Sequence, residues 1–253
     1  MTLVLRKPQD FKTWRKQQGL NKTLGFVPTM GALHSGHEEL LKQARRENEL
    51  VALSIFVNPT QFNNASDLDK YPMTFEADLA MAEKNNVDVI FFPQYIEMYP
   101  DNYRYKVSEY AYSNILDGAH RPGHFDGVLS VVMKLFNITS PSRAYFGEKD
   151  YQQLSLIKGM AESFFMDLEI IPVPTVREED GLAKSSRNVR LTESERQKAP
   201  LIFRAIKNSK SAEEAAQILI DDGFKVDYVT DIENRRFAAA YLGEVRLIDN
   251  VAI

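Results

Sequence analysis

The chain of 253 residues contains no cysteine, and this absence is the first limit on its chemistry. It excludes a disulfide framework, a thiolate zinc site and a cysteine nucleophile. The sequence also lacks a run of 18 apolar residues and an apolar signal-peptide core near its start. We therefore expect a cytoplasmic protein that does not enter a membrane.

An excess of positive charge is missing as well. The chain has 31 Lys and Arg against 35 Asp and Glu, a formal net charge of −4, which argues against a nucleic-acid-binding surface. The apolar fraction of 44% and the charged fraction of 26% are those of an ordinary globular protein. The length is sufficient for one large domain or two smaller ones with a sizeable core.

Apolar runs alternate with amphipathic segments over the first 175 residues. The runs predict strands at 24–29, 50–57, 87–92, 144–146 and 168–173. The amphipathic segments predict helices at 37–47, 74–85, 127–136 and 151–165. This alternation is typical of an α/β fold with a doubly wound parallel sheet, in which ligands bind beyond the carboxyl ends of the strands.

The pattern changes after residue 175. A polar, turn-like stretch at 177–181 is followed by expected helices at 193–208 and 211–222 and by short strands at 226–230, 237–242 and 245–248. We therefore predict two domains, 1–175 and a smaller α+β domain at 176–253. The cleft between them is the expected ligand site.

Two histidines, His34 and His37, stand where a tight turn leads from the first strand into a helix. The first N–H groups of a helix lack partners and the helix dipole favours negative charge there, so this is a place to hold a polyphosphate. The alternative is that one of these histidines is a simple helix cap or a surface group.

Polar loops also follow two further strands. Asn58 and Gln61 come after the second strand, and a glycine turn at Gly147 leads through Lys149 into a helix. A lysine at that end of a helix opposes the dipole, and a bound anion would remove the mismatch. The alternative is a solvated loop with Asp150 as the helix cap.

Basic groups occur in two more loops. Arg121 could hold a carboxylate or a phosphate with its forked guanidinium. The stretch 184–188, Lys-Ser-Ser-Arg-Asn, could close over a triphosphate and neutralise charge as pyrophosphate leaves. By itself this stretch is a weak signal, because charged linkers are usually only solvated.

Zinc is a competing interpretation, because all four histidines fall in two close pairs. His34 and His37 form one pair and His120 and His124 the other. A zinc hydrolase is disfavoured because the chain has no His-Glu-x-x-His helix and because basic loops are unusual neighbours for a metal.

Five blocks of sequence, in order, resemble the pantothenate synthetase (pantoate–β-alanine ligase) family. They are residues 28–37, 54–62, 121–125, 146–153 and 180–188, and the ending at 241–250 resembles the C-terminus of the family. The resemblance implies a Rossmann-type nucleotidyltransferase fold, Mg²⁺ with the ATP, and a homodimer. It also implies a reaction in which ATP and pantoate form a pantoyl adenylate that the amine of β-alanine attacks, giving pantothenate, AMP and pyrophosphate.

The resemblance assigns roles to particular residues. Those expected to act on the phosphates in catalysis are His34, His37, Lys149, Ser185, Ser186 and Arg187. Those expected to bind ATP are Met30, His37, Gly147, Lys149, Asp150, Val176, Lys184, Ser185, Ser186 and Arg187. Those expected to bind pantoate or β-alanine are Asn58, Gln61, Gln153, Met30 and Arg121. No metal ligand is assigned, and catalysis would rest on positioning and charge stabilisation.

The chain departs from the family pattern at three places. Thr60 and Lys184 stand where the family commonly has Met, and the C-terminal unit is expected to be shorter than usual. Two other functions fit the residues less well. An adenylyltransferase acting on a phosphorylated acceptor would need Arg or Lys where the chain has amides. A non-catalytic nucleotide-binding module would have lost the charged groups of the loops.

Overall fold

The computed structural model describes residues 1–63 and 68–253, which divide into two compact units. Met1–Gly147 and Gln152–Val173 make unit 1. Glu148–Tyr151 and Pro174–Ile253 make unit 2. The short segment Glu148–Tyr151 therefore groups with unit 2, although the chain on both sides of it belongs to unit 1.

Unit 1 is built on a six-stranded parallel sheet in the order β1-β4-β3-β2-β5-β6. The strands are β1 (Leu3–Leu5), β2 (Leu24–Thr29), β3 (Leu50–Ile55), β4 (Val89–Phe91), β5 (Arg143–Gly147) and β6 (Glu169–Val173). Every residue of β3 is buried, as its uninterrupted apolar run predicts for a central parallel strand. The expected α/β fold with a doubly wound, Rossmann-type parallel sheet is confirmed.

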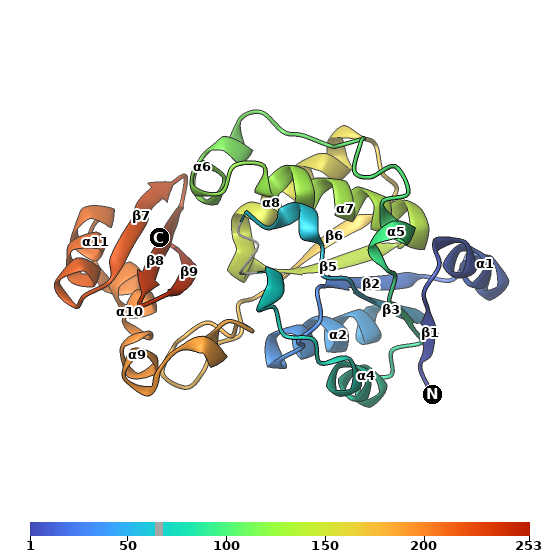
Figure 1. The fold of residues 1–253 in the computed structure, drawn as a ribbon, viewed down its shortest axis with the longest axis horizontal. Coiled ribbons are helices and arrows are strands. Elements are labelled where there is room, and N and C mark those ends of the chain that lie inside the picture. The colour runs from blue at the N-terminus through green and yellow to red at the C-terminus, as the bar shows by residue number, and fades with distance from the viewer. Residues whose placement is uncertain (64–67) are drawn as a thin grey trace. The chain divides into compact units, whose positions relative to one another are not determined.

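Helices cover both faces of this sheet (Figure 1). The longer ones are α1 (Pro8–Gln18), α2 (Ser35–Glu47), α4 (Phe75–Lys84), α7 (His124–Thr139) and α8 (Tyr151–Ser163), and the short ones are α5 (Tyr95–Met98) and α6 (Asp117–His120). Leu40, Leu41 and Ala44 form the apolar face of α2 and pack with Ala82 of α4 into one core. On the other face the ring of Phe136 in α7 meets Phe26 of β2 edge to face.

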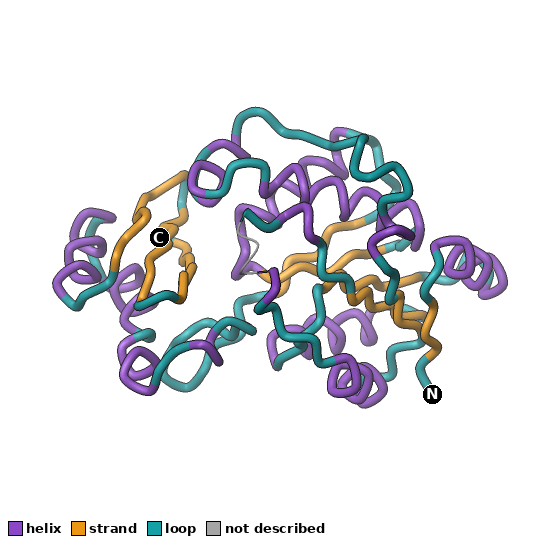
Figure 2. The backbone as a smooth tube through the Cα atoms, viewed as in Figure 1, coloured by secondary structure: helices purple, strands orange, loops and turns teal. Residues whose placement is uncertain are grey.

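Unit 2 is an α+β unit with a three-stranded antiparallel sheet in the order β7-β8-β9 (Figure 2). Its elements are α9 (Glu193–Lys198), α10 (Leu201–Asn208), α11 (Ala212–Asp221), β7 (Lys225–Ile232), β8 (Arg235–Leu242) and β9 (Val245–Ala252). Ile202 and Ile206 of α10 and Leu219 of α11 pack against the sheet in a single core.

Several parts of the chain differ from the sequence-based expectation, among them the short helices α5 and α6, which were not predicted. The helix expected at 193–208 is two helices, because Pro200 has no N–H to donate and α10 starts again after it. Strand β1 and helix α1 were not predicted. Only Phe11 and Arg15 of α1 are buried, so its sequence carries a weak apolar pattern.

Within residues 1–63 and 68–253, no helix is both long and apolar enough to cross a membrane.

Candidate active site

The expected binding edge of unit 1 lies where strands β3, β2 and β5 end side by side. Strand β3, which follows β2 in the chain, lies on one side of β2, and β5 lies on the other side of β2. This reversal is the topological switch point at which doubly wound sheets bind their ligands. The turn after β2, the loop after β3 and the end of β5 therefore meet at one edge.

The turn after β2 is held by Asp78, a buried residue of α4. Its carboxylate oxygens accept the N–H groups of Ala32 and Leu33 at 3.0 and 2.8 Å. Gly31, with φ 85°, and Ala32, with φ 50°, have left-handed backbone conformations. The turn is thus a strained loop fixed by a charged acceptor, and it delivers the chain to His34.

His34 and His37 cap the start of α2 reciprocally. Nδ1 of His34 accepts the N–H of Gly36 at 3.1 Å, and Nδ1 of His37 accepts the N–H of His34 at 3.3 Å. The two rings lie 4.1 Å apart between centroids. Because each Nδ1 is an acceptor, the proton of each neutral ring is assigned to Nε2. The cap and the phosphate-donor interpretations are therefore compatible, since they use different ring nitrogens.

The loop after β3 is organised by Asn58. This side chain is 1% exposed; its Nδ2 donates to Gln61 Oε1 at 3.0 Å and to the carbonyl of Gly127 at 3.1 Å. Its Oδ1 accepts hydrogen bonds from the hydroxyls of Thr60, at 3.0 Å, and Tyr99, at 2.9 Å. Asn58 thus holds the loop, and Thr60, an expected departure from the family pattern, is part of its network.

Gln61 is the member of this loop that reaches a neighbouring predicted site residue. Its Nε2 lies 3.4 Å from Sδ of Met30. A Cβ on Gly127 of α7 would lie 2.5 Å from the carbonyl oxygen of Thr60 and 2.7 Å from the N of Gln61. The loop can therefore lie against α7 only because residue 127 is a glycine.

In the second histidine pair, His120 and His124, the buried His124 connects two parts of the structure by hydrogen bonds. His124 is buried, and its Nδ1 donates to the carbonyl of Gln61 at 2.8 Å while its Nε2 accepts from Arg121 Nη1 at 3.1 Å. His120 is exposed. In the described part of the chain, no three His, Cys, Asp or Glu side chains gather as a metal site, so nothing there supports the zinc alternative.

The two adjacent glutamines of α8 differ in their surroundings. Gln152 is buried, accepts the N–H of Asp117 at 3.1 Å and donates to the carbonyls of Tyr112 and Ile115 at 2.7 and 2.8 Å. Gln153 is half-buried. Gln152 therefore fastens the loop before α6, and Gln153 is the candidate for a ligand.

In unit 2, Lys149 and Asp150 belong to a short 3-10 turn, Glu148–Asp150, that leads into α8. The ammonium of Lys149 lies 3.7 Å from Asp150 Oδ1, and 18% of the lysine side chain is exposed. Asp150 is half-exposed.

The loop at 184–187 follows a small antiparallel bridge in unit 2. Arg177 pairs with Ala183, and the N–H of Lys184 donates to the carbonyl of Val176 at 2.9 Å. The ammonium of Lys184 pairs with Glu178 Oε2, so this expected departure from the family pattern has a partner in its own hairpin. The hydroxyl of Ser185 accepts the N–H of Arg187 at 3.2 Å and shapes the turn.

Sequence reasoning missed several residues that support these loops, among them Asp78, Tyr99 and the structural role of His124. An acidic residue at a helix position otherwise filled by apolar side chains was the available signal for Asp78. No pattern in the sequence indicates that a tyrosine 41 residues further on bonds Asn58.

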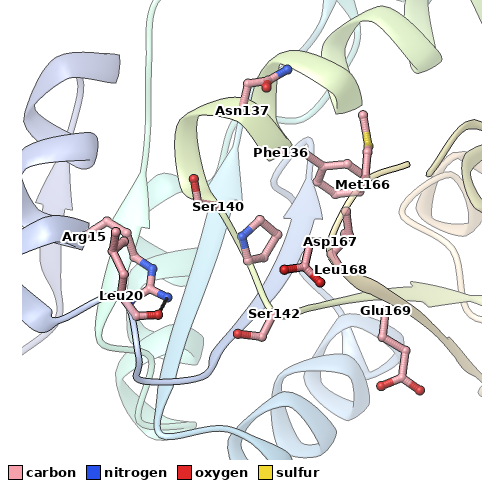
Figure 3. A pocket seen from close by; sticks show the side chains of 11 residues that line it. Arg15, Leu20, Phe136, Asn137, Ser140, Ser142, Met166, Asp167, Leu168 and Glu169 are labelled. Atoms are coloured by element: carbon pink, nitrogen blue, oxygen red, sulfur yellow. Dashed lines mark hydrogen bonds between the residues drawn. The ribbon is translucent and has the colours of Figure 1, made fainter. Parts of the chain in front are cut away.

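A cavity of about 780 Å³ lies at the opposite edge of the sheet (Figure 3). Ser142 and Glu169, at the amino ends of β5 and β6, line it together with Arg15. The guanidinium of Arg15 donates to the carbonyls of Gly19 and Lys22, at 2.9 Å each, and closes the end of α1. None of the predicted site residues lines this cavity.

Comparison with known proteins gives one consistent result. A sequence model described as pantoate-beta-alanine ligase matches residues 3–252. The chain is 74% identical, over the full length of both proteins, to the pantothenate synthetase of Bdellovibrio bacteriovorus. It is 49% identical to that of Coxiella burnetii over 99% of the chain and 97% of the relative.

Solved structures agree. The crystal structure of a Francisella tularensis pantoate-beta-alanine ligase, complexed with beta-gamma ATP and beta-alanine, has a TM-score of 0.95 at 42% identity and covers 100% of this chain and 98% of that one. The crystal structure of the Thermus thermophilus pantothenate synthetase has a TM-score of 0.91 at 38% identity, with 99% of both chains covered.

The parallel α/β fold and these likenesses define an enzyme of the ligase class. The chain belongs to the pantoate-beta-alanine ligase family. The chain covers 97–100% of the length of these proteins, and the expectation of a C-terminal unit shorter than is usual for the family stays a prediction.

Proposed function

We propose that the chain, as a pantoate-beta-alanine ligase, forms pantothenate in two steps through a pantoyl adenylate. In the first step the pantoate carboxylate attacks the α-phosphorus of ATP, and the bond from that phosphorus to pyrophosphate breaks. In the second step the amine of β-alanine attacks the acyl carbon of the pantoyl adenylate. AMP leaves with the bonding electron pair, the amine loses a proton, and an amide bond remains.

The observation that carries this proposal is the reciprocal cap of His34 and His37. With Nδ1 of each ring accepting a backbone N–H, the Nε2–H of each ring serves as a donor to phosphate oxygens. Ring N–H donors fixed before the reaction stabilise the charge that develops as pyrophosphate leaves, and they need no reorganisation. No covalent enzyme intermediate is required.

ATP binding is proposed for residues of both units. In unit 1 these are His34, His37, Met30 and Gly147, and in unit 2 they are Lys149, Asp150, Val176, Lys184, Ser185, Ser186 and Arg187. A Cβ on Gly147 would meet no atom within 4 Å, so the fold leaves room for a ligand there. Lys149 would bridge phosphate oxygens, Ser185, Ser186 and Arg187 would hold the β- and γ-phosphates, and Asp150 would lie near the ribose.

Pantoate and β-alanine are proposed to bind in unit 1. Gln61 and Gln153 supply amides that suit the hydroxyls and carboxylate of pantoate. Met30 packs beside them, as its contact with Gln61 supports. Asn58 and Arg121 act here by shaping the loop: Asn58 through Gln61 Oε1, and Arg121 through His124 and the Gln61 carbonyl.

Mg²⁺ is proposed to enter with ATP. This ion keeps several waters and is commonly held by substrate phosphates with one or two carboxylates. The ion would neutralise phosphate charge, and the chain's own residues orient the reactants.

Three broader expectations complete the proposal: a homodimer, a cytoplasmic location, and separate domains at 1–175 and 176–253, the second acting as a lid. Light scattering during size-exclusion chromatography tests the dimer, with a monomer mass as the contrary result. Cell fractionation tests the location, and small-angle scattering with and without ATP tests closure.

The deciding experiment measures AMP and pyrophosphate released from ATP with candidate acids and amines. We expect release of both only when pantoate and β-alanine are present together with ATP. Pyrophosphate exchange with pantoate alone would report the adenylate step. If ATP binds and pantoate with β-alanine gives no turnover, the proposed reaction is wrong.

A further inference from the structure

Two neighbouring residues of β9, Asp249 and Asn250, contact two separate segments of unit 2. One is the turn that contains Lys149, and the other is the hairpin that leads into the 184–187 loop. The sequence shows both residues only as part of a C-terminal stretch typical of the family. Neither is among the residues assigned above to ATP.

Asn250 fastens the first segment through the main chain. Its Nδ2 donates to the carbonyls of Glu148 and Lys149, both at 2.9 Å, and its Oδ1 accepts from Nη1 of Arg235. The guanidinium of Arg235 lies 3.8 Å from the ring centre of Tyr151. Asn250 is 4% exposed, so its amide is committed to these protein groups.

Asp249 fastens the second segment. Its two carboxylate oxygens accept from Nη1 and Nη2 of Arg177 at 2.6 and 2.9 Å. Arg177 also donates to the carbonyl of Gly181 at 3.0 Å, and its guanidinium stacks on Phe203 at 3.8 Å. A bidentate pair of this kind fixes direction as well as distance.

We propose that Asp249 and Asn250 are positioning residues of the ATP site. They join the turn that contains Lys149 and the hairpin that leads into the 184–187 loop into one rigid piece. This inference rests on the proposed role of Lys149. A lysine side chain is long and flexible, so its ammonium is placed only as well as its backbone is held. Misplacement of a catalytic group by about 1 Å can lower a rate by about a hundredfold.

The first test is Asn250→Asp, which keeps the shape and the acceptor for Arg235 but removes the Nδ2 donor. We expect the Kd of a non-hydrolysable ATP analogue, measured by calorimetry, to rise about tenfold, and the KM for pantoate to change by less than about twofold. Asp227→Asn is the matched control. It removes the charge of Asp227, whose ion pair with Arg246 in the same sheet is 2.8 Å long, and neither residue belongs to the two segments.

The second test repeats Asn250→Asp in a Lys149→Ala background. If Asn250 acts through Lys149, the additional loss of ATP affinity disappears there. Direct repulsion between the new carboxylate and ATP would instead persist in this background and would contradict the proposal. Asn250→Ala, which adds no charge, replaces Asn250→Asp if that variant fails to fold.

The two hypotheses fail in different ways. If Lys149→Ala binds the analogue as tightly as the unmodified chain, the proposed function of Lys149 is wrong. If Lys149→Ala weakens binding but Asn250→Asp and Asn250→Ala do not, the role of Lys149 stands and the positioning proposal is wrong.

Discussion

His37 accepts the backbone N–H of His34 on its Nδ1 atom at 3.3 Å. The ring that caps the start of α2 through Nδ1 is therefore assigned its proton on Nε2, so stability and chemistry are divided between two atoms of one side chain. Substitutions that keep one atom and remove the other can separate the two roles.

The first prediction compares His37→Asn with His37→Gln. Asparagine offers an acceptor near the position of Nδ1 and lacks the donor at Nε2, whereas glutamine does the opposite. We expect His37→Asn to keep its stability. Its rate of adenylate formation, measured by pyrophosphate exchange, should fall about 10²–10³-fold. We expect His37→Gln to keep more activity and to lose about 0.5–2 kcal/mol of stability to urea.

His37→Ala should show both losses. Near-normal turnover of His37→Asn would remove His37 from the catalytic residues, and equal stability of all three variants would show that the cap has no energetic weight.

The second prediction concerns Asp78, which the sequence did not single out. Asp78→Ala leaves the N–H groups of Ala32 and Leu33 without their acceptor, so we expect a loss of about 1–3 kcal/mol in urea unfolding. The turn then no longer fixes the start of α2, and adenylate formation should fall as well. Glu76→Ala, an exposed carboxylate of the same helix, should change neither quantity. A stable, fully active Asp78→Ala would contradict the role given to this carboxylate.

The sheet could be predicted because its signal is local. The fully buried run of β3 and the apolar face of α2 are readable over six to thirteen residues. The candidate residues at the strand ends followed from the same signal, since parallel strands end at one edge. Strand β1 has three residues and pairs with β4 some 86 positions later, so its own sequence contains too little to reveal it.

The supporting contacts could not be predicted, because they join residues that are distant in sequence. Asp78 bonds a turn 45 residues earlier, and Asn250 bonds Lys149 101 residues earlier. The four histidines look alike in the sequence, yet His124 is buried and hydrogen-bonds both Arg121 and the Gln61 carbonyl. Residue type and spacing do not distinguish such a structural histidine from one that binds a ligand. Burial and hydrogen-bond partners do distinguish them.

The third prediction is a loss of stability at high pH. Burial raises the pKa of Tyr99 from 10 to about 12, against smaller opposing effects of its bonds to Thr60 and Asn58. The unfolded chain therefore releases this proton first, and stability falls as the pH rises from 10 towards 12, by up to about 1.4 kcal/mol per pH unit. Burial also raises the pKa of Tyr145, which acts in the same direction.

The matching variant is Tyr99→Phe, which removes the titrating hydroxyl and keeps the ring. Urea midpoints measured between pH 9 and pH 12 should fall less steeply for Tyr99→Phe than for the unmodified chain. Parallel curves would show that Tyr99 does not titrate in this window.

The fourth prediction uses the two glutamines of α8 as controls for each other. Gln152→Ala removes a buried amide that bonds two carbonyls before α6 and the first N–H of α6, so we expect a loss of about 1–3 kcal/mol of stability. Gln153→Ala should leave the free energy of unfolding in urea within about 0.5 kcal/mol of that of the unmodified chain, because its side chain holds no main-chain group among the described residues.

The kinetic effect of Gln153→Ala should fall on pantoate. The KM of this variant for pantoate should rise about tenfold or more, since an unpaired substrate hydroxyl costs about as much as one hydrogen bond. The KM for ATP should not change. A raised KM for ATP with an unchanged KM for pantoate would transfer Gln153 from the pantoate site to the nucleotide site, and no kinetic change at all would remove it from both.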